Sequence, residues 1–280
     1  QLGVDAYDPA REEQVFAKIQ GFNAGTLPKD SLRSIYREVI SSSIALEKEL
    51  VIGYLGPEAT FTHHAAKLNF GSALAYRALP DIPDVFQAVE NGECDYGVVP
   101  IENSTEGAVN RSLDLLVDTE LTIIAQVYLK IEHCLFSTVP LDQVTEVRSK
   151  DQALAQCGEW LRRNLPSVGL VPVASTAEAV RECASGKGRA AIAGKLAGEA
   201  HGIPLLERGI QDRKDNVTRF LVVNKQSSAR RDGVNYRTSL VLSLPDQAGA
   251  LQSSLNPFSS RGINLCKIES RPSRRKTWDY

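Results

Sequence analysis

Two polar motifs follow apolar runs and carry side chains that can bind an anion. The first is Gly56–Thr62 (GPEATFT), which lies between a strand-like run and a helical pattern. Free backbone N–H groups at such a junction attract negative charge, and the hydroxyl of Thr60 adds a donor. The same hydroxyl can simply cap the helix, so the residues alone leave both interpretations open.

The second motif is Pro100–Gly107 (PIENSTEG), in which four polar residues, 102–105, follow a buried strand-like run. The carboxyl ends of strands are where α/β folds bind their ligands. A helix cap accounts for one of the four polar residues but not for all of them. We therefore favour a functional site in this motif.

Other hydroxyl and amide groups stand at similar places. Thr218 and Arg219, in the motif NVTRF, can together hold or protonate a carboxylated substrate, although Arg219 can equally be a surface charge. Ser149 ends a strand-like run, and Gln156 lies two helical turns beyond it. Thr176 repeats this strand-to-helix pattern, but each of these signals is weak because Ser and Thr are ordinary helix caps.

Several classes of protein are excluded. There is no Ser-His-Asp arrangement, Walker loop or metal-ligand spacing, and we expect neither a metal nor a cofactor. The adjacent His63 and His64 point about 100° apart on a helix, so they cannot readily share an ion, and we expect both at the surface. A net charge of −2 over 280 residues argues against a nucleic-acid partner, and no apolar run is long enough to predict a membrane partner.

The cysteines predict the compartment. Their odd count and the absence of a CxxC pair fit a disulfide framework poorly. The five are Cys94, Cys134, Cys157, Cys183 and Cys266. We expect reduced, structural thiols in a cytoplasmic protein.

The elements that must position these residues alternate between strand and helix from Val51 onward, which is typical of an α/β fold. The predicted strands are Val51–Leu55, Leu74–Ala78, Tyr96–Pro100, Leu121–Val127, Lys130–Phe136, Thr145–Ser149, Leu170–Val173, Ala190–Ala193 and Arg219–Val223. The predicted helices are 58–69, 82–91, 107–117, 151–164, 176–185 and 194–201. This rhythm predicts two small lobes that together bind a small anion.

The flanking segments have a different character. Residues 8–20 open with an Asp-Pro helix start followed by acidic residues, and residues 30–50 repeat apolar side chains at helical spacing, so both segments are predicted helices. A polar linker at Asn224–Asn235 precedes a predicted β-α-β unit, whose elements are Arg237–Leu244, Ala248–Arg261 and Ile263–Ile268. Because the chain lacks methionine altogether, we expect it to be part of a longer protein.

Three motifs, in this order, resemble those of prephenate dehydratases. Gly56–Phe61 is similar to the GPxGTF element of that family, Glu102–Gly107 to its ENS-x-x-G element and Thr218–Phe220 to its TRF element. Gly249–Leu251 and Glu269–Pro272 resemble the GAL and ESRP motifs of the phenylalanine-binding ACT domain. The helices at the front resemble the later part of a chorismate mutase. The whole chain thus resembles a bifunctional chorismate mutase–prephenate dehydratase that is truncated at both ends.

The resemblance implies a two-lobed dehydratase domain with a periplasmic-binding-protein-like (type II) α/β fold. Its expected boundaries are 51–225, with one lobe at about 51–129 and 208–225 and the other at about 130–207. A partial all-helical mutase domain (1–50) would precede it, and a linker (226–235) and a partial βαβ ACT domain (236–280) would follow. Ala59 replaces the usual Gly of the first motif, which costs about 1 kcal/mol or more if this position requires a positive φ.

The resemblance also implies an activity: prephenate loses carbon dioxide and water and becomes phenylpyruvate. The residues expected to act on the substrate or its leaving group are Thr218, Asn103, Ser149 and Gln156. Those expected to bind its carboxylates are Thr60, Ser104, Thr176 and Arg219. Two rival functions remain open at this point: an arogenate dehydratase and a non-enzymatic, small-anion-binding sensory module.

The flanking domains carry further implied sites. The mutase remnant comprises Asp8, Arg11, Glu12, Ser43 and Glu47, the last standing where some relatives have Gln. The implied phenylalanine effector site comprises Gly249, Ala250, Leu251, Asn264, Glu269, Ser270, Arg271 and Pro272. An effector site completed across a subunit interface implies a homodimer or homotetramer.

Overall fold

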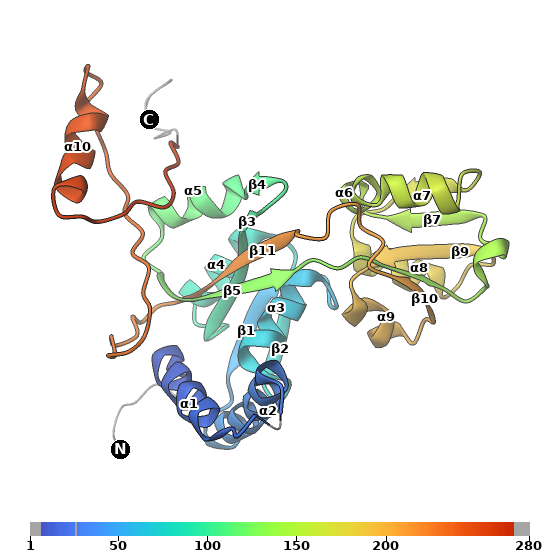
Figure 1. Ribbon diagram of the computed structural model, residues 1–280, viewed down its shortest axis with the longest axis horizontal. Coiled ribbons are helices and arrows are strands. Elements are labelled where there is room, and N and C mark those ends of the chain that lie inside the picture. Colours follow the sequence, from blue (N-terminus) through green and yellow to red (C-terminus); the bar gives the residue numbers. More distant parts are fainter. Residues whose placement is uncertain (1–6, 26, 272–280) are drawn as a thin grey trace. The chain divides into compact units, whose positions relative to one another are not determined.

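The computed structural model describes residues 7–25 and 27–271 (Figure 1). The chain divides into two compact units, Gln1–Val234 and Asn235–Tyr280, which are described separately below. The first unit contains both sheets of the molecule that lie within the described residues, and it carries the candidate site.

The first sheet has six strands, which combine parallel and antiparallel pairs (Figure 1). The strand order is β2 (Ala75–Leu79), β1 (Val51–Leu55), β3 (Tyr96–Asn103), β11 (Val217–Asn224) and β5 (Thr122–Lys130), with β4 (Gly107–Ala108) paired to β3. Strand β1 runs parallel to β2 and β3, whereas β11 runs antiparallel to β3 and β5. The late strand β11 therefore lies beside the early strand β3.

Helices cover both faces of this sheet. One apolar cluster joins it to α3 (Phe61–Phe70), and a second joins it to α4 (Ile82–Glu90) and α5 (Asn110–Asp118). Alternate residues of β11 enter the two clusters, Val222 the first and Val223 the second, because neighbouring side chains of a strand point to opposite faces.

The second sheet has five strands and, like the first, has helices on both faces. Its order is β10 (Leu205–Arg208), β6 (Cys134–Ser137), β9 (Arg189–Ala193), β7 (Glu146–Ser149) and β8 (Gly169–Pro172). Two helices contribute to each core cluster: α6 (Asp151–Gln156) and α7 (Gly158–Asn164) to one, α8 (Thr176–Cys183) and α9 (Lys195–His201) to the other. A short 3-10 helix spans Leu141–Gln143. The prediction of a two-lobed α/β fold is confirmed.

The chain crosses between the two sheets twice, through residues 131–133 and 209–216. The two crossovers run side by side, since Ile210 N donates to His133 O at 3.0 Å and Ile131 N donates to Asn216 O at 2.9 Å. Polar side chains in these segments therefore lie at the junction of the lobes.

The N-terminal helices α1 (Pro9–Phe22) and α2 (Lys29–Glu47) pack on the first lobe. Tyr7 and Ile44 belong to the same apolar cluster as the sheet, and Asn69 Nδ2 donates to the Tyr7 hydroxyl at 2.7 Å. A Cβ on Gly71 would lie 2.4 Å from Ser41 Cβ, so glycine permits the close approach of α2 at this position.

The second unit contains one helix, α10 (Ala250–Ser259), within the described residues. It starts directly after Gly249, whose φ is +83°. The predicted strands at 237–244 and 263–268 are wrong, because neither segment forms a strand in the structure. Side chains such as Val241 and Ile268 remain exposed, and a strand without a ladder partner gains too little to offset the entropy lost on ordering.

The sequence also misplaced several boundaries. The predicted strand 130–136 is interrupted by the crossover, and the predicted helix 151–164 divides at Cys157. The predicted helix 107–117 starts only at Asn110, because Gly107–Ala108 forms a short strand. The edge strand β10 was not predicted. Each error falls where a tertiary hydrogen bond or a change of direction overrides the local pattern.

Two details of the first motif are decided by the structure. Ala59 has a φ of +63°, so the conditional cost stated above applies, and its methyl group packs in the core of the second lobe. His63 is buried rather than exposed: its ring stacks on Tyr54, and burial lowers its pKa to about 4. His63 therefore stays uncharged near neutral pH.

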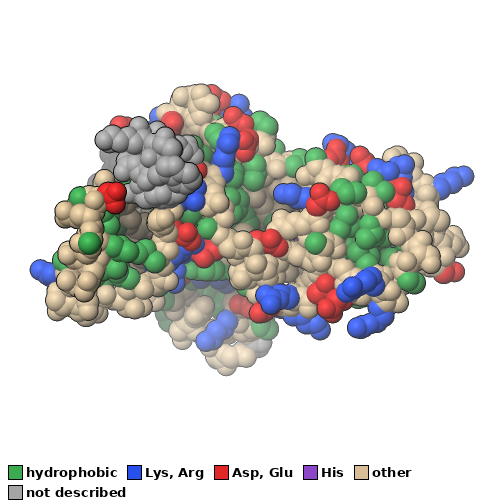
Figure 2. All heavy atoms as spheres, turned by 90° about the horizontal axis from the view of Figure 1, so that it is seen from above, with side chains coloured by type: hydrophobic (Ala, Val, Ile, Leu, Met, Phe, Trp, Pro, Cys, Tyr) green, Lys and Arg blue, Asp and Glu red, His purple; other side chains and the backbone are tan. Residues whose placement is uncertain are grey.

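The surface carries both signs of charge. Figure 2 shows one face, on which Lys and Arg side chains are interspersed with Asp and Glu. Within residues 7–25 and 27–271, no helix combines the length and the apolar character needed to cross a membrane.

Candidate functional site

The candidate site begins with a register pair between two strands. Thr218 on β11 lies opposite Asn103 on β3, so both side chains stand on the same face of the sheet. Asn103 Nδ2 donates to Thr218 Oγ1 at 2.8 Å. Because the Thr218 oxygen accepts this bond, its own proton is left to donate, and none of the described residues accepts it.

The carboxamide oxygen of Asn103 fixes the turn that follows β3. It accepts from Thr105 N at 2.9 Å, Thr105 Oγ1 at 2.6 Å and Glu106 N at 3.1 Å. These three bonds orient the amide, which leaves its nitrogen facing Thr218 and Asn216. The ENS motif therefore uses Asn103 as the fixed centre of a polar cluster.

The cluster continues into the second lobe through Asn216 and Gln156. Asn216 Oδ1 accepts from Asn103 at 2.7 Å, and Asn216 Nδ2 donates to Gln156 Oε1 at 3.4 Å. His133 Nε2 lies 2.9 Å from the same Gln156 oxygen, and Gln156 Nε2 donates to Glu106 Oε1 at 3.0 Å. Side chains from β3, both crossovers, α6 and β11 thus form one network.

Apart from the Glu106 carboxylate, which accepts from Gln156, the network consists of neutral side chains. Burial lowers the pKa of His133, and the hydrogen bond to Gln156 opposes this only in part. Thr218 and Asn216 are buried as well. Such preorganised donors in a water-poor site can stabilise negative charge that develops on a leaving oxygen.

Two other predicted residues, Ser104 and Ser149, use their hydroxyls to bond backbone groups. Ser104 Oγ accepts from Val217 N at 2.9 Å and so ties the ENS turn to the start of β11. Ser149, the last residue of β7, donates to Ile192 O at 2.6 Å and is fully buried. Ser149 therefore anchors the strand end that precedes α6, the helix of Gln156.

The structure does not bring the three remaining predicted residues into the network. Thr60 caps α3, donating to Leu55 O and accepting from His63 N. Thr176 is the buried first residue of α8, whose cap is the neighbouring Ser175. Arg219 follows Thr218 in the strand, so its side chain points to the opposite face, and it pairs with Glu102 at 2.9 Å.

Comparison with known proteins identifies the family. The family described as "Prephenate dehydratase" matches residues 52–228, and the family described as "Chorismate mutase type II" matches residues 1–48. The chain belongs to the prephenate dehydratase family. The dehydratase segment includes every residue of the network around Thr218.

Individual relatives agree with this assignment. The bifunctional chorismate mutase/prephenate dehydratase of Aquifex aeolicus is 42% identical over 277 residues, which are 97% of this chain and 76% of that protein. The protein of the same name from Neisseria gonorrhoeae is 44% identical over 278 residues, 98% of this chain and 76% of that protein. The structure of a prephenate dehydratase from Arthrobacter aurescens in complex with L-Phe matches with a TM-score of 0.70 and 33% identity, covering 80% of this chain and 77% of that one.

The residues attributed to the mutase segment lie apart from the dehydratase network. Arg11, Ser43 and Glu47 are exposed, and Ser43 donates to Val39 O of its own helix. Asp8 caps α1 by accepting from Arg11 N at 2.9 Å, and it also accepts from Arg231 Nε at 2.9 Å.

Glu12 has a different environment from the other mutase residues. It is buried beside Arg37 of α2, with 2.5 Å between Oε2 and the guanidinium. Burial raises the pKa of Glu12, and the charge of Arg37 opposes this shift. Glu12 therefore joins the two helices.

The predicted effector residues lie in the second unit. Gly249 precedes the first turn of α10, which contains Ala250 and the exposed Leu251. Asn264 and Ser270 are exposed, and Glu269 pairs with Lys267 at 3.4 Å. Arg271 is half-buried, and Pro272 lies outside the described residues.

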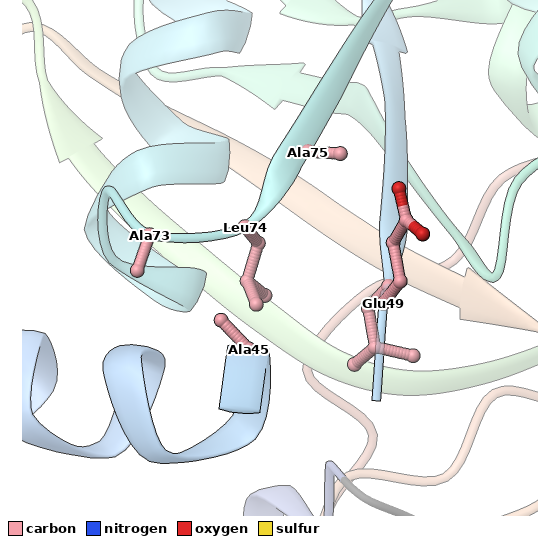
Figure 3. A pocket seen from close by; sticks show the side chains of 6 residues that line it. Ala45, Glu49, Ala73, Leu74 and Ala75 are labelled. Carbon is pink, nitrogen blue, oxygen red and sulfur yellow. The ribbon is translucent and has the colours of Figure 1, made fainter. Parts of the chain in front are cut away.

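Two shallow hollows open on the first lobe, away from the dehydratase network. One, of about 280 Å³, lies where α2 meets the starts of β1 and β2; its lining is Ala45, Glu49, Leu50, Ala73, Leu74 and Ala75 (Figure 3). The other, of about 270 Å³, is lined by Tyr54, Glu58, His63, Lys67, Ser72, Tyr76 and Ala78. Neither hollow contains a residue of the network, so a volume alone would not have located the site.

Sequence reasoning missed three members of the network. Glu106 and Asn216 lie inside the quoted motifs but were given no role, since neither stands at a strand end by its own pattern. His133 was not singled out at all. Its signal is a polar residue directly before the fully buried strand Cys134–Ser137, because a polar side chain at such a place must find a buried partner.

Proposed function

We propose that the chain converts prephenate to phenylpyruvate, with Thr218 as the group that assists the departing hydroxide. The observation that carries this proposal is the hydrogen bond from Asn103 to Thr218 Oγ1, which leaves the Thr218 proton to donate. Membership of the prephenate dehydratase family supports the substrate class.

The reaction needs little more from the protein than such a donor. The bond between the ring carbon and its carboxylate breaks, and the electron pair moves into the ring as carbon dioxide leaves. The C–O bond at the opposite ring carbon breaks, and the departing hydroxide takes up a proton to become water. Aromatisation supplies driving force, so the chemical task is stabilisation of charge on that oxygen.

The remaining side chains orient this donor and the substrate. Asn103 fixes the Thr218 hydroxyl, and Gln156 offers amide hydrogens from the second lobe. We assign Ser149 to the support of Gln156, because it anchors the strand end before α6. Closure of the two lobes would exclude water and strengthen each of these contacts.

The two carboxylates of prephenate require further donors. We assign them to Thr60, Ser104, Thr176 and Arg219. Thr60 and Thr176 stand at helix starts, where unpaired N–H groups favour an anion. Arg219 would have to exchange its partner Glu102 for the substrate.

We further propose the domain limits 1–50, 51–225, 226–235 and 236–280 for mutase, dehydratase, linker and ACT segments. The division of the structure after Val234 supports the last of these. Chorismate would bind through Asp8, Arg11, Ser43 and Glu47, with Glu12 holding the helices.

L-phenylalanine is the proposed effector of residues 249–251, 264 and 269–272, supported by the relative whose structure contains L-Phe. A homodimer or homotetramer would complete that site. The four buried free thiols support a reducing, cytoplasmic location.

The test is the formation of phenylpyruvate from prephenate by residues 1–280. Thr218→Ala should lower kcat by about 100-fold or more while the thermal unfolding curve stays close to that of the parent. Thr218→Ser should retain part of the rate because it keeps the hydroxyl, and Thr218→Val is the matched variant without one. A kcat near the parental value in Thr218→Ala would refute the role of this residue.

The same assay separates the two substrates. Comparing kcat/KM for prephenate and arogenate asks whether the keto or the amino compound is preferred, since the two differ only at that group. A chain that binds prephenate but forms no phenylpyruvate would be the sensory module instead.

A further inference from the structure

His133 is a buried histidine that belongs to neither the motifs nor the proposed chemistry. It lies in the first crossover between the lobes and is 2% exposed. Its backbone is held from both sides: His133 N donates to Gln211 Oε1 at 2.9 Å, and His133 O accepts from Ile210 N at 3.0 Å. The ring is therefore carried by a fixed segment of chain.

The ring has a defined protonation state and tautomer. Burial lowers the pKa of His133, so the imidazole is neutral near pH 7. Its Nε2 lies 2.9 Å from Gln156 Oε1, which can only accept. The proton must therefore be on Nε2, and Nδ1 carries the lone pair.

The other ring nitrogen indicates that packing alone does not explain this histidine. Nδ1 is buried and has no hydrogen-bond partner in the described part of the chain. An unpaired buried acceptor costs about 1–3 kcal/mol, which an apolar side chain of similar shape would avoid. The ring edge also meets Phe61 in a T-shaped contact, with 5.6 Å between centroids, a contact that a phenyl ring could make equally well.

The hydrogen bond that His133 does make fixes the side chain of Gln156. The backbone oxygen of Gln156 accepts from Asp212 N at 2.8 Å, and its side-chain oxygen faces both His133 and Asn216. With the oxygen fixed by two donors, the amide hydrogens must point the other way, where one of them is bonded to Glu106. Without His133, the amide oxygen would keep only the longer 3.4 Å bond from Asn216, and the amide nitrogen its bond to Glu106.

We propose that His133 is a positioning residue for the dehydratase reaction, which acts by fixing the side-chain amide of Gln156 so that its hydrogens face the substrate. This inference rests on the proposed function, because Gln156 is there assigned to the substrate. It adds that the crossover between the lobes, and not only the strand ends, sets the geometry of the site.

The test compares variants of residues 1–280 in the phenylpyruvate assay. His133→Phe keeps the ring and its contact with Phe61 but removes the donor; it should lower kcat about ten-fold or more with little change in KM. His133→Gln places an N–H near the position of Nε2 and should restore much of the rate, whereas His133→Asn reaches only to the position of Nδ1 and should not. His201→Phe, at the exposed end of α9, is the matched control.

A double-mutant cycle distinguishes positioning from a structural role. If His133 acts through Gln156, His133→Phe should have no further effect on kcat in a Gln156→Leu background. Effects that multiply, or a parental kcat in His133→Phe, would overturn the inference. If His133→Phe does not fold, the comparison of His133→Gln with His133→Asn decides, and equal rates for these two would overturn the inference.

A second measurement does not depend on activity. The side-chain NH₂ signals of Gln156 in a ¹H–¹⁵N spectrum can be identified by their loss in Gln156→Leu. They should shift in His133→Phe and return toward the parental position in His133→Gln; unchanged signals in His133→Phe would refute the contact. If the parent chain forms no phenylpyruvate, the proposed function fails, while these signals still decide whether His133 orients Gln156.

Discussion

The polar side chains around Thr218 and those on helices α1 and α2 are held in different ways. Asn103, Thr218 and Gln156 are joined by hydrogen bonds that cross from one lobe to the other. Arg11 and Glu47, by contrast, stand exposed on separate helices and share no hydrogen bond. The first group forms a preorganised site, whereas the second is a pair of charged positions on open helix faces.

The difference comes from the elements that carry the side chains. Two antiparallel strands in register fix the distance between opposite residues, so the pairing of β3 with β11 by itself places Asn103 on Thr218. A helix fixes only the residues on its own face, and α1 and α2 are joined by the buried pair of Glu12 and Arg37 and by the more exposed pair of Glu13 and Arg33. In the helical region, the buried pair of Glu12 and Arg37 therefore holds two helices together rather than forming part of a site.

The largest expected effect concerns this buried pair. Arg37→Met should lower the free energy of unfolding by about 3 kcal/mol, because it leaves the Glu12 carboxylate buried without its cation. Methionine keeps an apolar contact with Phe16, over which the guanidinium now lies at 4.9 Å. Chemical denaturation at pH 7 measures the loss.

The pH dependence of the unfolding free energy of Arg37→Met tests whether the loss comes from the unpaired Glu12 carboxylate. Burial already raises the pKa of Glu12, and removal of Arg37 raises it further. The folded variant then binds a proton more tightly than the unfolded chain does, so its stability relative to the parent should recover as the pH falls from 7 to about 5. A loss that is the same at both pH values would show that it does not come from the unpaired Glu12 carboxylate.

The second effect tests the preorganised site. Asn103→Asp keeps the oxygen that accepts from the turn but replaces the donor to Thr218 and Asn216 by a second carboxylate oxygen. We expect kcat for phenylpyruvate formation to fall about 100-fold, because the Thr218 hydroxyl would then donate to the introduced carboxylate rather than to the leaving oxygen.

Asn110→Asp is the matched control for this substitution, since it makes the same change at the start of α5, outside the network. If Asn103→Asp and Asn110→Asp had equal, small effects on kcat, the pairing of Asn103 with Thr218 would play no part in catalysis.

The smallest effect is expected on the exposed helix faces. Ser43→Ala and Glu47→Gln should each change the free energy of unfolding by less than about 0.5 kcal/mol, because neither side chain is buried or paired across the fold. Dehydratase kcat should be unchanged in both. A clear loss of dehydratase activity in either variant would mean that the exposed helix faces and the network around Thr218 are coupled.

Much of the fold could be predicted because it follows from local patterns. The run Val51–Leu55 became β1 over the same residues, and Asp8 caps α1 as an Asp-Pro start requires. The tail shows the limit of this reasoning: the run 237–244 has the composition of a strand, yet it finds no neighbour to pair with. Strand formation depends on a partner, which no local pattern supplies.

The sequence by itself determined the family of this protein and three members of its polar network, because motifs such as ENS and TRF keep their residue types in order along the chain. Only the tertiary structure decided which of the candidate residues meet. It placed Thr218 and Arg219 on opposite faces of β11, paired Glu12 with Arg37, and brought His133 and Asn216 to Gln156 through the two crossovers. The physical reason is that these contacts join distant residues: strand register joins Asn103 to Thr218 across 115 positions, and the crossovers join His133 and Asn216 to Gln156 across 23 and 60. Such contacts follow no helical or strand period that a sequence could show.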